Sequence, residues 1–518
     1  MPHCQNSSCS PCDALSQVEM RLAEAKALVE RLTVETYLLK SAVNTAHDSL
    51  THRLPRELVS RIFTFSVPPF AQLVPSPYWD PMYSSPGTLT LVCNAWKNIA
   101  LSTPQLWNSF AIRLYSPTCA STLHLIETYI KRSGALPLAI RINMHKGEDL
   151  SHFPYAMFYP MFDILNVHSH RWHTLTLNIP FSLTSRLTGS PSSGASRLEC
   201  LAIHKPSSPP GPRSSVGFGS HHAQFRPSMI WMGGLYLDAI QIDWSHVTNV
   251  NVVSLSVEEC LQLLRLAPLL REFRLGSILG GSGSAQVQVT HYSLQTWDLT
   301  SFGPLASLLC DQLTLPKLQC LKIYDGPYDS LERLLKRSSC PLSYFGLCMG
   351  DASGLISLFR AMPHLKHFCL EDLSSGDDEI TSWCALMAST TTFPADSDES
   401  TLFLSRLETV EYYRCPRLLW ATIPYWFPPK ETKLGIRYRP LSAVHIGVDV
   451  PPSEMEDEAI DSNTIQELIN VVDRGFVLRV NNVYEDEEEE APEPEPETEE
   501  NFIEASMQYH DRRGVTVS

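Results

Sequence analysis

The sequence of 518 residues lacks long hydrophobic runs. No stretch approaches the roughly 18 consecutive apolar residues that identify a membrane-spanning helix. The N-terminal segment MPHCQNSSCSPCD has no basic region followed by an apolar one, so no secretory signal is visible. We therefore expect a protein without a membrane span, located in the cytoplasm, the nucleus or both.

A net positive charge is also missing. The chain has 40 Lys and Arg residues against 56 Asp and Glu residues, which gives a formal net charge of −16. Residues 454–500 hold 18 acidic residues and two basic ones, so the rest of the chain sums to zero. A neutral body offers no broad basic face, which argues against nucleic acid as a partner.

The motifs of common enzyme classes are absent as well. The sequence contains no phosphate-binding GxxxxGK[ST], no zinc-binding HExxH and no GxSxG nucleophile turn. Residues 276–284 are rich in glycine but lack nucleotide-binding spacing, which is more typical of a flexible loop. We expect a chain that is not an enzyme, with no catalytic residues and no cofactor.

Two groups of potential metal ligands are weak candidates. The first group lies near the N-terminus and consists of His3, Cys4, Cys9 and Cys12. It has one CxxC spacing, but the second cysteine pair of a zinc ribbon is missing, so a disordered tail of free thiols over residues 1–12 is the better interpretation. The second group comprises His168, His170 and His173. It has no nearby carboxylate or cysteine partner, and we expect no metal site in either group.

Residues 13–50 carry a heptad pattern. Apolar or small residues alternate at spacings of three and four: Leu15, Val18, Leu22, Ala25, Val29, Leu32, Thr36, Leu39, Val43, Ala46 and Leu50. This 3.5-residue period predicts a coiled-coil helix about 55 Å long. Two alanines and a threonine weaken the seam, so two interpretations stay open. The helix either forms a homodimer through residues 13–50 or folds back on the body of its own chain.

Two short amphipathic segments follow within residues 51–110. In the first, Leu54, Leu58 and Ile62 recur every four residues and share one helical face. Pro55 suits the first turn of a helix because its missing N–H would be unpaired there. The second segment has a similar pattern with Val92, Trp96, Ile99 and Ala100. Together they predict a small helical unit.

The order of motifs in this segment is LPxELxxxIF, then VCxxWxxIA, then PxLW. It resembles the F-box, a small helical module that docks on the Skp adaptor of SCF ubiquitin ligases. The insertion at 67–88 is longer than the turn of a compact F-box and resembles the version found in fungal F-box proteins.

The resemblance implies a Skp-type adaptor and, through it, a cullin as partners. It implies these adaptor-binding residues: Leu54, Pro55, Leu58, Ile62, Val92 and Trp96. The same residues could instead form the core of the helical unit, an alternative that is stronger for Trp96 and Trp107.

Residues 111–450 repeat a helix, a turn and a strand. The strand-like segments close at intervals of 20 to 24 residues, at Leu255, Leu275, Leu299, Ile323, Leu347 and Leu370. This period lies in the range of leucine-rich repeats, whose units stack because none can bury its apolar face alone. The asparagine that usually follows the strand is missing, so the body resembles an irregular leucine-rich-repeat-like α/β solenoid. Another α/β fold is the alternative.

The C-terminal region, residues 451–518, is acidic. Glu485–Glu490 is a run of six acids followed by alternating proline and glutamate, and repulsion between like charges predicts a disordered tail. Just before it, Thr464–Val480 has the pattern of a helix followed by a strand.

The predicted fold class is therefore α/β, in five parts: a tail (1–12), a coiled-coil helix (13–50), an F-box (51–110), a repeat body (111–450) and an acidic C-terminal region (451–518). The implied function is that of a substrate-receptor subunit of an SCF-type E3 ubiquitin ligase, which presents an unknown protein target on its repeat body. The alternative is a non-catalytic coiled-coil and leucine-rich-repeat scaffold with no ligase role.

Overall fold

The structure is a computed structural model. It describes residues 10–67, 86–114, 119–144, 155–190, 197–204, 217–219, 225–280, 288–300, 304–324, 326, 328–348, 354–371, 377–394, 403–413, 419–429, 436–448, 460–482 and 500–501. The chain divides into two compact units, Met1–Leu198 and Glu199–Ser518. Most of the predicted insertion at 67–88, the first nine residues and the run Glu485–Glu490 lie outside the described residues.

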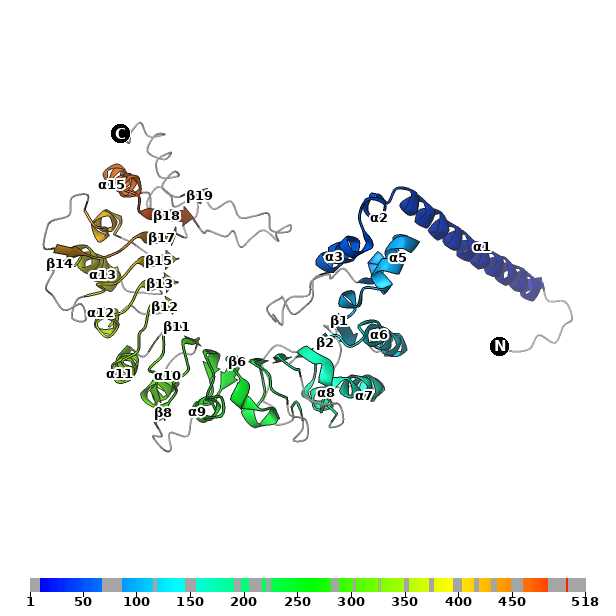
Figure 1. Cartoon of the computed structure of the whole chain (residues 1–518), viewed down its shortest axis with the longest axis horizontal. Coiled ribbons are helices and arrows are strands. Elements are labelled where there is room, and N and C mark those ends of the chain that lie inside the picture. Colours follow the sequence, from blue (N-terminus) through cyan, green and yellow to red (C-terminus); the bar gives the residue numbers. More distant parts are fainter. Residues whose placement is uncertain are drawn as a thin grey trace. The chain divides into compact units, whose positions relative to one another are not determined.

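The first unit opens with the long helix α1 (Ser10–Ala46), drawn in blue in Figure 1. Every described side chain from Cys12 to Lys40 is exposed. Near its C-terminal end, the Asn44 Nδ2 donates a hydrogen bond of 2.7 Å to the Val92 carbonyl. The predicted helix is therefore present, but its seam does not fold back on any described part of the chain.

Short helices follow α1 and pack into a small module. They are α2 (Ser49–Arg53), α3 (Arg56–Ser66), α4 (Pro86–Leu89), α5 (Asn94–Leu101) and the 3-10 helix η2 (Pro104–Leu106). Val59 and Phe63 on α3 and Ile99 and Ala100 on α5 are buried between the helices. The apolar spacing of the sequence thus produces one buried face on each of α3 and α5.

Three parallel strands complete the first unit. β1 (Ser109–Leu114), β2 (Leu138–Met144) and β3 (Trp172–Asn178) lie side by side in that order. The connecting segments contain α6 (Cys119–Arg132), η4 (Tyr155–Phe158), α7 (Tyr159–Val167) and η5 (Ser169–Arg171), and α8 (Phe181–Thr184) follows β3. All but one side chain of β2 is buried, as expected for a parallel strand covered on both faces.

The core of the helical module continues into the α6 and β1 region that follows it in the chain. The ring of Trp107 lies 5.1 Å from that of Tyr129 on α6, in an edge-on arrangement. The Tyr129 ring also lies 5.1 Å from that of Phe110 on β1. The helical module and β1–β3 therefore share packing contacts within one unit.

The second unit contains a large parallel sheet. Its strands are β4 (Cys200–His204), β5 (Met229–Met232), β6 (Asn249–Leu255), β7 (Glu272–Ile278), β9 (Thr296–Leu299), β11 (Cys320–Tyr324), β12 (Tyr344–Cys348), β13 (His367–Glu371), β15 (Thr409–Tyr413), β17 (Ala443–Val448) and β18 (Val477–Asn482). Each pairs in parallel with the next in this series. β19 (Glu500–Asn501) adds an antiparallel edge to β18. The sheet thus grows strand by strand in chain order.

Helices lie along one side of these strands (Figure 1). They are α9 (Val257–Leu266), α10 (Pro304–Asp311), α11 (Tyr328–Ser338), α12 (Leu355–Phe359), α13 (Asp377–Ser389) and α15 (Ser462–Asp473), with the 3-10 helices η6 (Leu237–Ala239), η7 (Trp244–His246) and η9 (Trp420–Trp426). Two small strand pairs accompany them, namely β8 (Val289–Thr290) with β10 (Leu313–Thr314) and β14 (Thr392–Pro394) with β16 (Ile436–Tyr438). The predicted helix and strand of Thr464–Val480 are confirmed as α15 and β18.

The core of the second unit lies between strands and helices. Leu321 and Ile323 on β11, for example, are buried, whereas Lys322 between them is exposed on the opposite face. The strands β9 and β15 show the same alternation, which follows from the two-residue period of a β-strand, whereas β12 and β13 are buried over consecutive residues. Polar side chains therefore collect on the face of the sheet that the helices do not cover.

A fully buried arginine, Arg439, ties the end of α13 to this core. Its guanidinium donates to the carbonyl groups of Met387 and Thr390 at 3.0 Å each, and to that of Leu404 at 3.2 Å. Burial lowers the pKa of Arg439 to about 10, so the side chain is still charged at neutral pH. The last carbonyl groups of a helix accept such hydrogen bonds because they have no partner within the helix.

Candidate functional site: an exposed apolar stripe and a polar strand face

Helix α3 has one buried and one exposed apolar face. Val59 and Phe63 are almost completely buried. Leu58, Ile62 and Phe65 retain 48%, 40% and 73% of their surface. The spacing of four and three residues places these three side chains on one side of the helix. We call them the α3 stripe.

Polar contacts fix α3 against α5, so the stripe sits on an anchored helix. The Arg56 guanidinium donates to the Asn98 carbonyl at 3.2 Å and to the Ser102 hydroxyl at 2.6 Å. The hydroxyl groups of Ser60 and Thr103 lie 2.8 Å apart. These bonds hold the buried face of α3 in place and leave the stripe facing solvent.

Trp96 is half-buried and packs against the module's core. Its ring centroid lies 4.8 Å from that of Phe63, and its indole N–H donates to the Asp48 carboxylate at 3.0 Å. Asp48 also accepts from the backbone N–H groups of Leu50 and Thr51, and so caps α2. Burial opposes the charged form of Asp48, but the hydrogen bonds from Thr51, Trp96 and Leu50 outweigh it and hold its pKa below the usual range.

The remaining sequence-derived candidates are dispersed around this module. Leu54 is half-buried at the end of α2, and Pro55 is exposed at the N-terminal cap of α3. Val92 is half-buried before α5, and its backbone carbonyl accepts a hydrogen bond from the Asn44 side chain. The structure therefore brings Leu58 and Ile62 onto one exposed face, while Val92 and Trp96 contribute to internal contacts.

Sequence reasoning did not select two further exposed apolar residues. Phe65 extends the α3 stripe, and the Arg61 guanidinium lies 5.7 Å from its ring centroid. Leu91, just before α5, is 63% exposed. The i, i+4, i+7 spacing from Leu58 was the available signal for Phe65, but nothing in the sequence distinguishes Leu91 from a core leucine.

A second candidate surface is the uncovered face of the sheet in the second unit. From β5 to β18 the register aligns one residue of each strand in a row: Trp231, Asn251, Arg274, Asp298, Lys322, Gly346, Cys369, Glu411, His445 and Arg479. We call these residues the strand-face row. Gly346 and Cys369 in this row are buried. Charges of both signs alternate at the centre of the row, where Asp298 is flanked by Arg274 and Lys322. Burial raises the pKa of Asp298, and the two cations oppose this shift.

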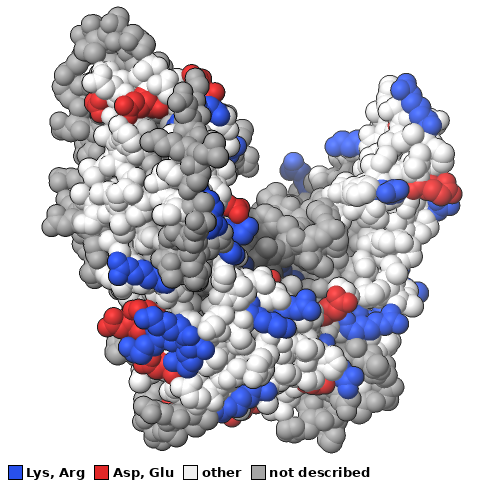
Figure 2. Space-filling model, turned by 60° about the vertical axis from the view of Figure 1, so that its left-hand side comes forward, with Lys and Arg blue, Asp and Glu red and all other residues white. Residues whose placement is uncertain are grey.

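Charged side chains elsewhere are also mixed. On the face drawn in Figure 2, Lys and Arg of the described residues are interspersed with Asp and Glu and separated by uncharged surface.

Cysteines and tyrosines near the row do not form a reactive centre. Cys348 Sγ lies 3.4 Å from Glu371 Oε2. Burial and then the Glu371 charge raise the pKa of Cys348 to about 12, and burial and then Glu411 raise that of Cys369 to about 12. The nucleophile in cysteine chemistry is the thiolate, so these thiols are poor nucleophiles at neutral pH.

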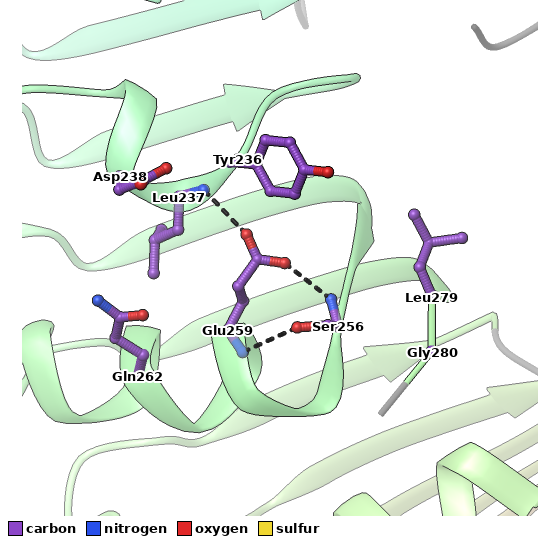
Figure 3. A pocket seen from close by; sticks show the side chains of 8 residues that line it. All are labelled: Tyr236, Leu237, Asp238, Ser256, Glu259, Gln262, Leu279 and Gly280. Carbon is purple, nitrogen blue, oxygen red and sulfur yellow. Dashed lines mark hydrogen bonds between the residues drawn. The ribbon is translucent and has the colours of Figure 1, made fainter. Parts of the chain in front are cut away.

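A surface pocket of about 600 Å³ lies beside the N-terminus of α9 (Figure 3). Its central charged group is Glu259, which accepts from the backbone N–H of Ser256 and from that of Leu237, at 3.0 Å each. The Ser256 hydroxyl in turn accepts from the Glu259 N–H, which completes a capping box. The carboxylate thus joins η6 to α9, and the described lining offers no nucleophile with a base beside it.

Only some residues of the two candidate metal-ligand groups lie within the described ranges. His3, Cys4 and Cys9 lie outside the described residues, whereas Cys12 is exposed on α1. Within the described ranges, His, Cys, Asp and Glu form no cluster that could hold a metal ion. Burial, Arg171 and then His170 lower the pKa of His168.

None of the described helices has the length and apolarity required to cross a membrane. No family model and no curated protein matches the chain. The interpretation of its function therefore rests on its own residues and their arrangement.

Proposed function

We propose that residues 51–110 form an F-box that docks on a Skp-type adaptor, and that the chain is a substrate-receptor subunit of an SCF-type ubiquitin ligase. The observation that supports this most directly is the α3 stripe. The order of the three sequence motifs is a second support, because it does not depend on the apolar spacing within any single helix.

The physical argument is that the stripe is apolar, exposed and anchored. Removing apolar surface from water is the dominant favourable contribution to most protein–protein association. Leu58, Ile62 and Phe65 project from a helix whose opposite face is fixed by Phe63 and Trp96. A partner can therefore cover the stripe without first reorganising the module, which lowers the entropic cost of binding.

The second unit would present the target. We interpret its sheet as a degenerate leucine-rich-repeat-like solenoid, because consecutive strands pair in parallel with a helix between many of them. The strand-face row would contact a protein target through Arg274, Asp298 and Lys322. In this role the chain positions another protein's reaction and does not itself catalyse one.

The second candidate function is an interaction scaffold with no ligase role. Trp96, one of the six residues that the resemblance assigns to the adaptor, packs on Phe63 and binds Asp48 inside the module. This placement suits a helical unit whose residues serve packing alone.

A binding experiment separates the two functions. In the full chain, Leu58→Lys/Ile62→Lys should weaken binding to a purified Skp adaptor by roughly 100-fold or more, because two charges would enter an apolar interface. Leu and Lys have similar helix propensities and both side chains are exposed, so α3 should stay folded. Circular dichroism checks the fold, and calorimetry measures the affinity.

The second unit offers a matched control. Leu266 and Leu269 are 41% and 52% exposed, close to Ile62 and Leu58. Leu266→Lys/Leu269→Lys should bind the adaptor as the wild type does. A folded Leu58→Lys/Ile62→Lys chain that binds with unchanged affinity would exclude the ligase function and favour the scaffold.

A further inference from the structure

Helix α1 carries an apolar seam that the described residues elsewhere in the chain leave uncovered. Between 50% and 64% of the surface of each large seam residue is exposed: Leu15, Val18, Leu22, Val29, Leu32, Leu39 and Val43. The helix touches the module through Asn44, which lies outside the seam. The seam is therefore free to meet another helix along its whole length.

We infer that α1 pairs with α1 of a second copy of the chain, as an antiparallel two-stranded coiled coil. The occupant follows from the residues beside the seam, because a coiled coil chooses its partner and orientation through these flanking charges. The seam residues alone do not decide the orientation, since small residues weaken some layers in either arrangement.

A parallel pair of these helices has a conflict. With Leu15 and Val18 as the first seam positions, a parallel dimer places Arg21 of one copy beside Lys26 of the other, and does so twice. Glu35 and Lys40 would attract each other in the same arrangement. The favourable and unfavourable contacts therefore offset each other, and nothing selects the parallel pair.

An antiparallel pair over residues 15–46 avoids this conflict. Val18 then meets Val43, Leu22 meets Leu39 and Val29 meets Leu32, so that every seam residue has a counterpart. Beside the seam, Glu19 of each copy faces Lys40 of the other. No flanking position of this register places like charges together.

The neighbouring registers are less favourable. A shift by one heptad in one direction brings Lys26 against Lys26 of the second copy, although Arg21 then faces Glu35. A shift in the other direction brings Lys26 against Lys40 and Glu35 against Glu35. Each shift also shortens the seam. Of these three registers, the overlap of residues 15–46 has the longest seam and is the one that places no like charges together.

This arrangement has a defined geometry. At a rise of 1.5 Å per residue, the overlap is about 48 Å long. Each copy continues from Ala46 into α2 and the helical module. Because the two helices run in opposite directions, the two modules emerge at opposite ends of the coiled coil, where each α3 stripe can be reached independently.

The first test is the association state of the full chain, measured by sedimentation over a concentration series. The wild type should form a dimer. Leu22→Lys/Leu39→Lys should weaken dimerisation by at least about 100-fold, because these residues meet in two layers of the seam. Met20→Lys/Leu38→Lys is the matched control, since both residues lie on α1 outside the seam and are 61% exposed. The control should remain dimeric.

The second test determines the orientation. Glu19→Lys should weaken the dimer roughly tenfold, and the double change Glu19→Lys/Lys40→Glu should restore it. Neither residue has a charged neighbour three or four positions away on its own helix, so the swap leaves pairs within the helix unchanged. In a parallel dimer Glu19 faces Ala14, so Glu19→Lys would have no effect, and Lys40→Glu would repel Glu35.

The outcomes are distinguishable. A monomeric wild type, a higher oligomer, or a control that dissociates as readily as Leu22→Lys/Leu39→Lys would overturn the coiled-coil dimer. A double swap that fails to recover the affinity lost by Glu19→Lys would overturn the antiparallel orientation.

Discussion

The helical module and the uncovered face of the sheet present two different kinds of surface. The α3 stripe is apolar and strongly exposed, and it lies on a helix held by buried contacts. The strand-face row carries alternating charges, and its central carboxylate, Asp298, is partly withdrawn from water. A surface of the first kind supplies affinity through burial, whereas one of the second kind supplies specificity through charge complementarity. The contrast suits a chain that binds one constant partner and one selected partner.

The largest expected effect tests whether these two surfaces are independent. Arg439→Met removes the guanidinium that binds the carbonyl groups of Met387, Thr390 and Leu404, and leaves them buried without this donor. We expect a loss of about 3–5 kcal/mol in the free energy of unfolding of the second unit. Urea titration measures it.

The control is the exposed Arg437, two residues earlier. Arg437→Met should change the free energy of unfolding by less than about 1 kcal/mol. In native buffer, both variants should bind a Skp adaptor as the wild type does. Adaptor binding that falls with the stability of Arg439→Met would show that the two surfaces depend on each other.

A smaller effect is expected at the base of the module. Asp48→Ala removes the cap of α2 and the acceptor of the Trp96 indole, and should destabilise the module by about 1–3 kcal/mol. Hydrogen exchange of the α3 and α5 amides measures this change. Asp48→Asn, which keeps an acceptor oxygen, should recover part of it.

The same carboxylate gives the module a pH dependence. Its folded pKa lies below its unfolded value, so its stabilisation is fully present above the unfolded pKa of about 4. The stabilisation is lost as the pH falls through the folded pKa. The exchange rates of the wild type should therefore rise in acid more steeply than those of Asp48→Ala. Parallel pH profiles would contradict this role of Asp48.

The smallest effect is expected in the strand-face row. The raised pKa of Asp298 means that its charged form is disfavoured in the folded state, so it lowers stability at pH values above its folded pKa. Asp298→Asn should leave stability at neutral pH unchanged or raise it by less than about 1 kcal/mol. Thermal unfolding at neutral pH measures the change. A clear destabilisation would show that Arg274 and Lys322 hold Asp298 for structural reasons, and that the row is less suited to binding.

The period of the strand markers in the sequence corresponds to the register of several strands in the second unit. Leu275, Leu299, Ile323, Leu347 and Leu370 are direct partners in register from β7 to β13. The first marker, Leu255, closes β6 as predicted, but it is out of register with the others, because Val252 pairs with Leu275 and Leu255 lies opposite Ile278. A strand with several apolar residues gives no local sign of which one is in register.

The glycine-rich segment was predicted as a flexible loop, and its first part is different. Gly276 lies inside β7, which continues to Ile278. A Cβ atom at this position would approach the Val253 carbonyl oxygen to 2.6 Å, so the close approach of β6 requires glycine. The sequence shows the glycine but not the neighbouring strand that explains it.

The sequence patterns also did not predict the buried arginines, which donate hydrogen bonds to groups at or beyond the ends of helices. Arg171 donates to the Leu136 carbonyl at 3.0 Å and to the Ser133 hydroxyl at 2.6 Å, beyond the end of α6. The buried Arg439 does the same for α13, and Arg337, which is exposed, binds the Cys310 carbonyl in α10. Arginine is usually exposed, and the acceptors of these arginines lie 24 or more residues away, so no local pattern reveals these contacts.

The sequence by itself determined the period of α1, the apolar faces of α3 and α5, and the order of helices and strands, because local spacing decides which side chains share a face. The tertiary structure decided which of these faces is covered. Trp96 turns inward because Phe63 and Asp48 lie beside it, whereas Leu58 and Ile62, with the same helical spacing, face solvent. It also decided which charges stand together in the strand-face row, because neighbouring strands come from segments more than twenty residues apart. Burial depends on contacts between distant parts of the chain, and no local spacing encodes it.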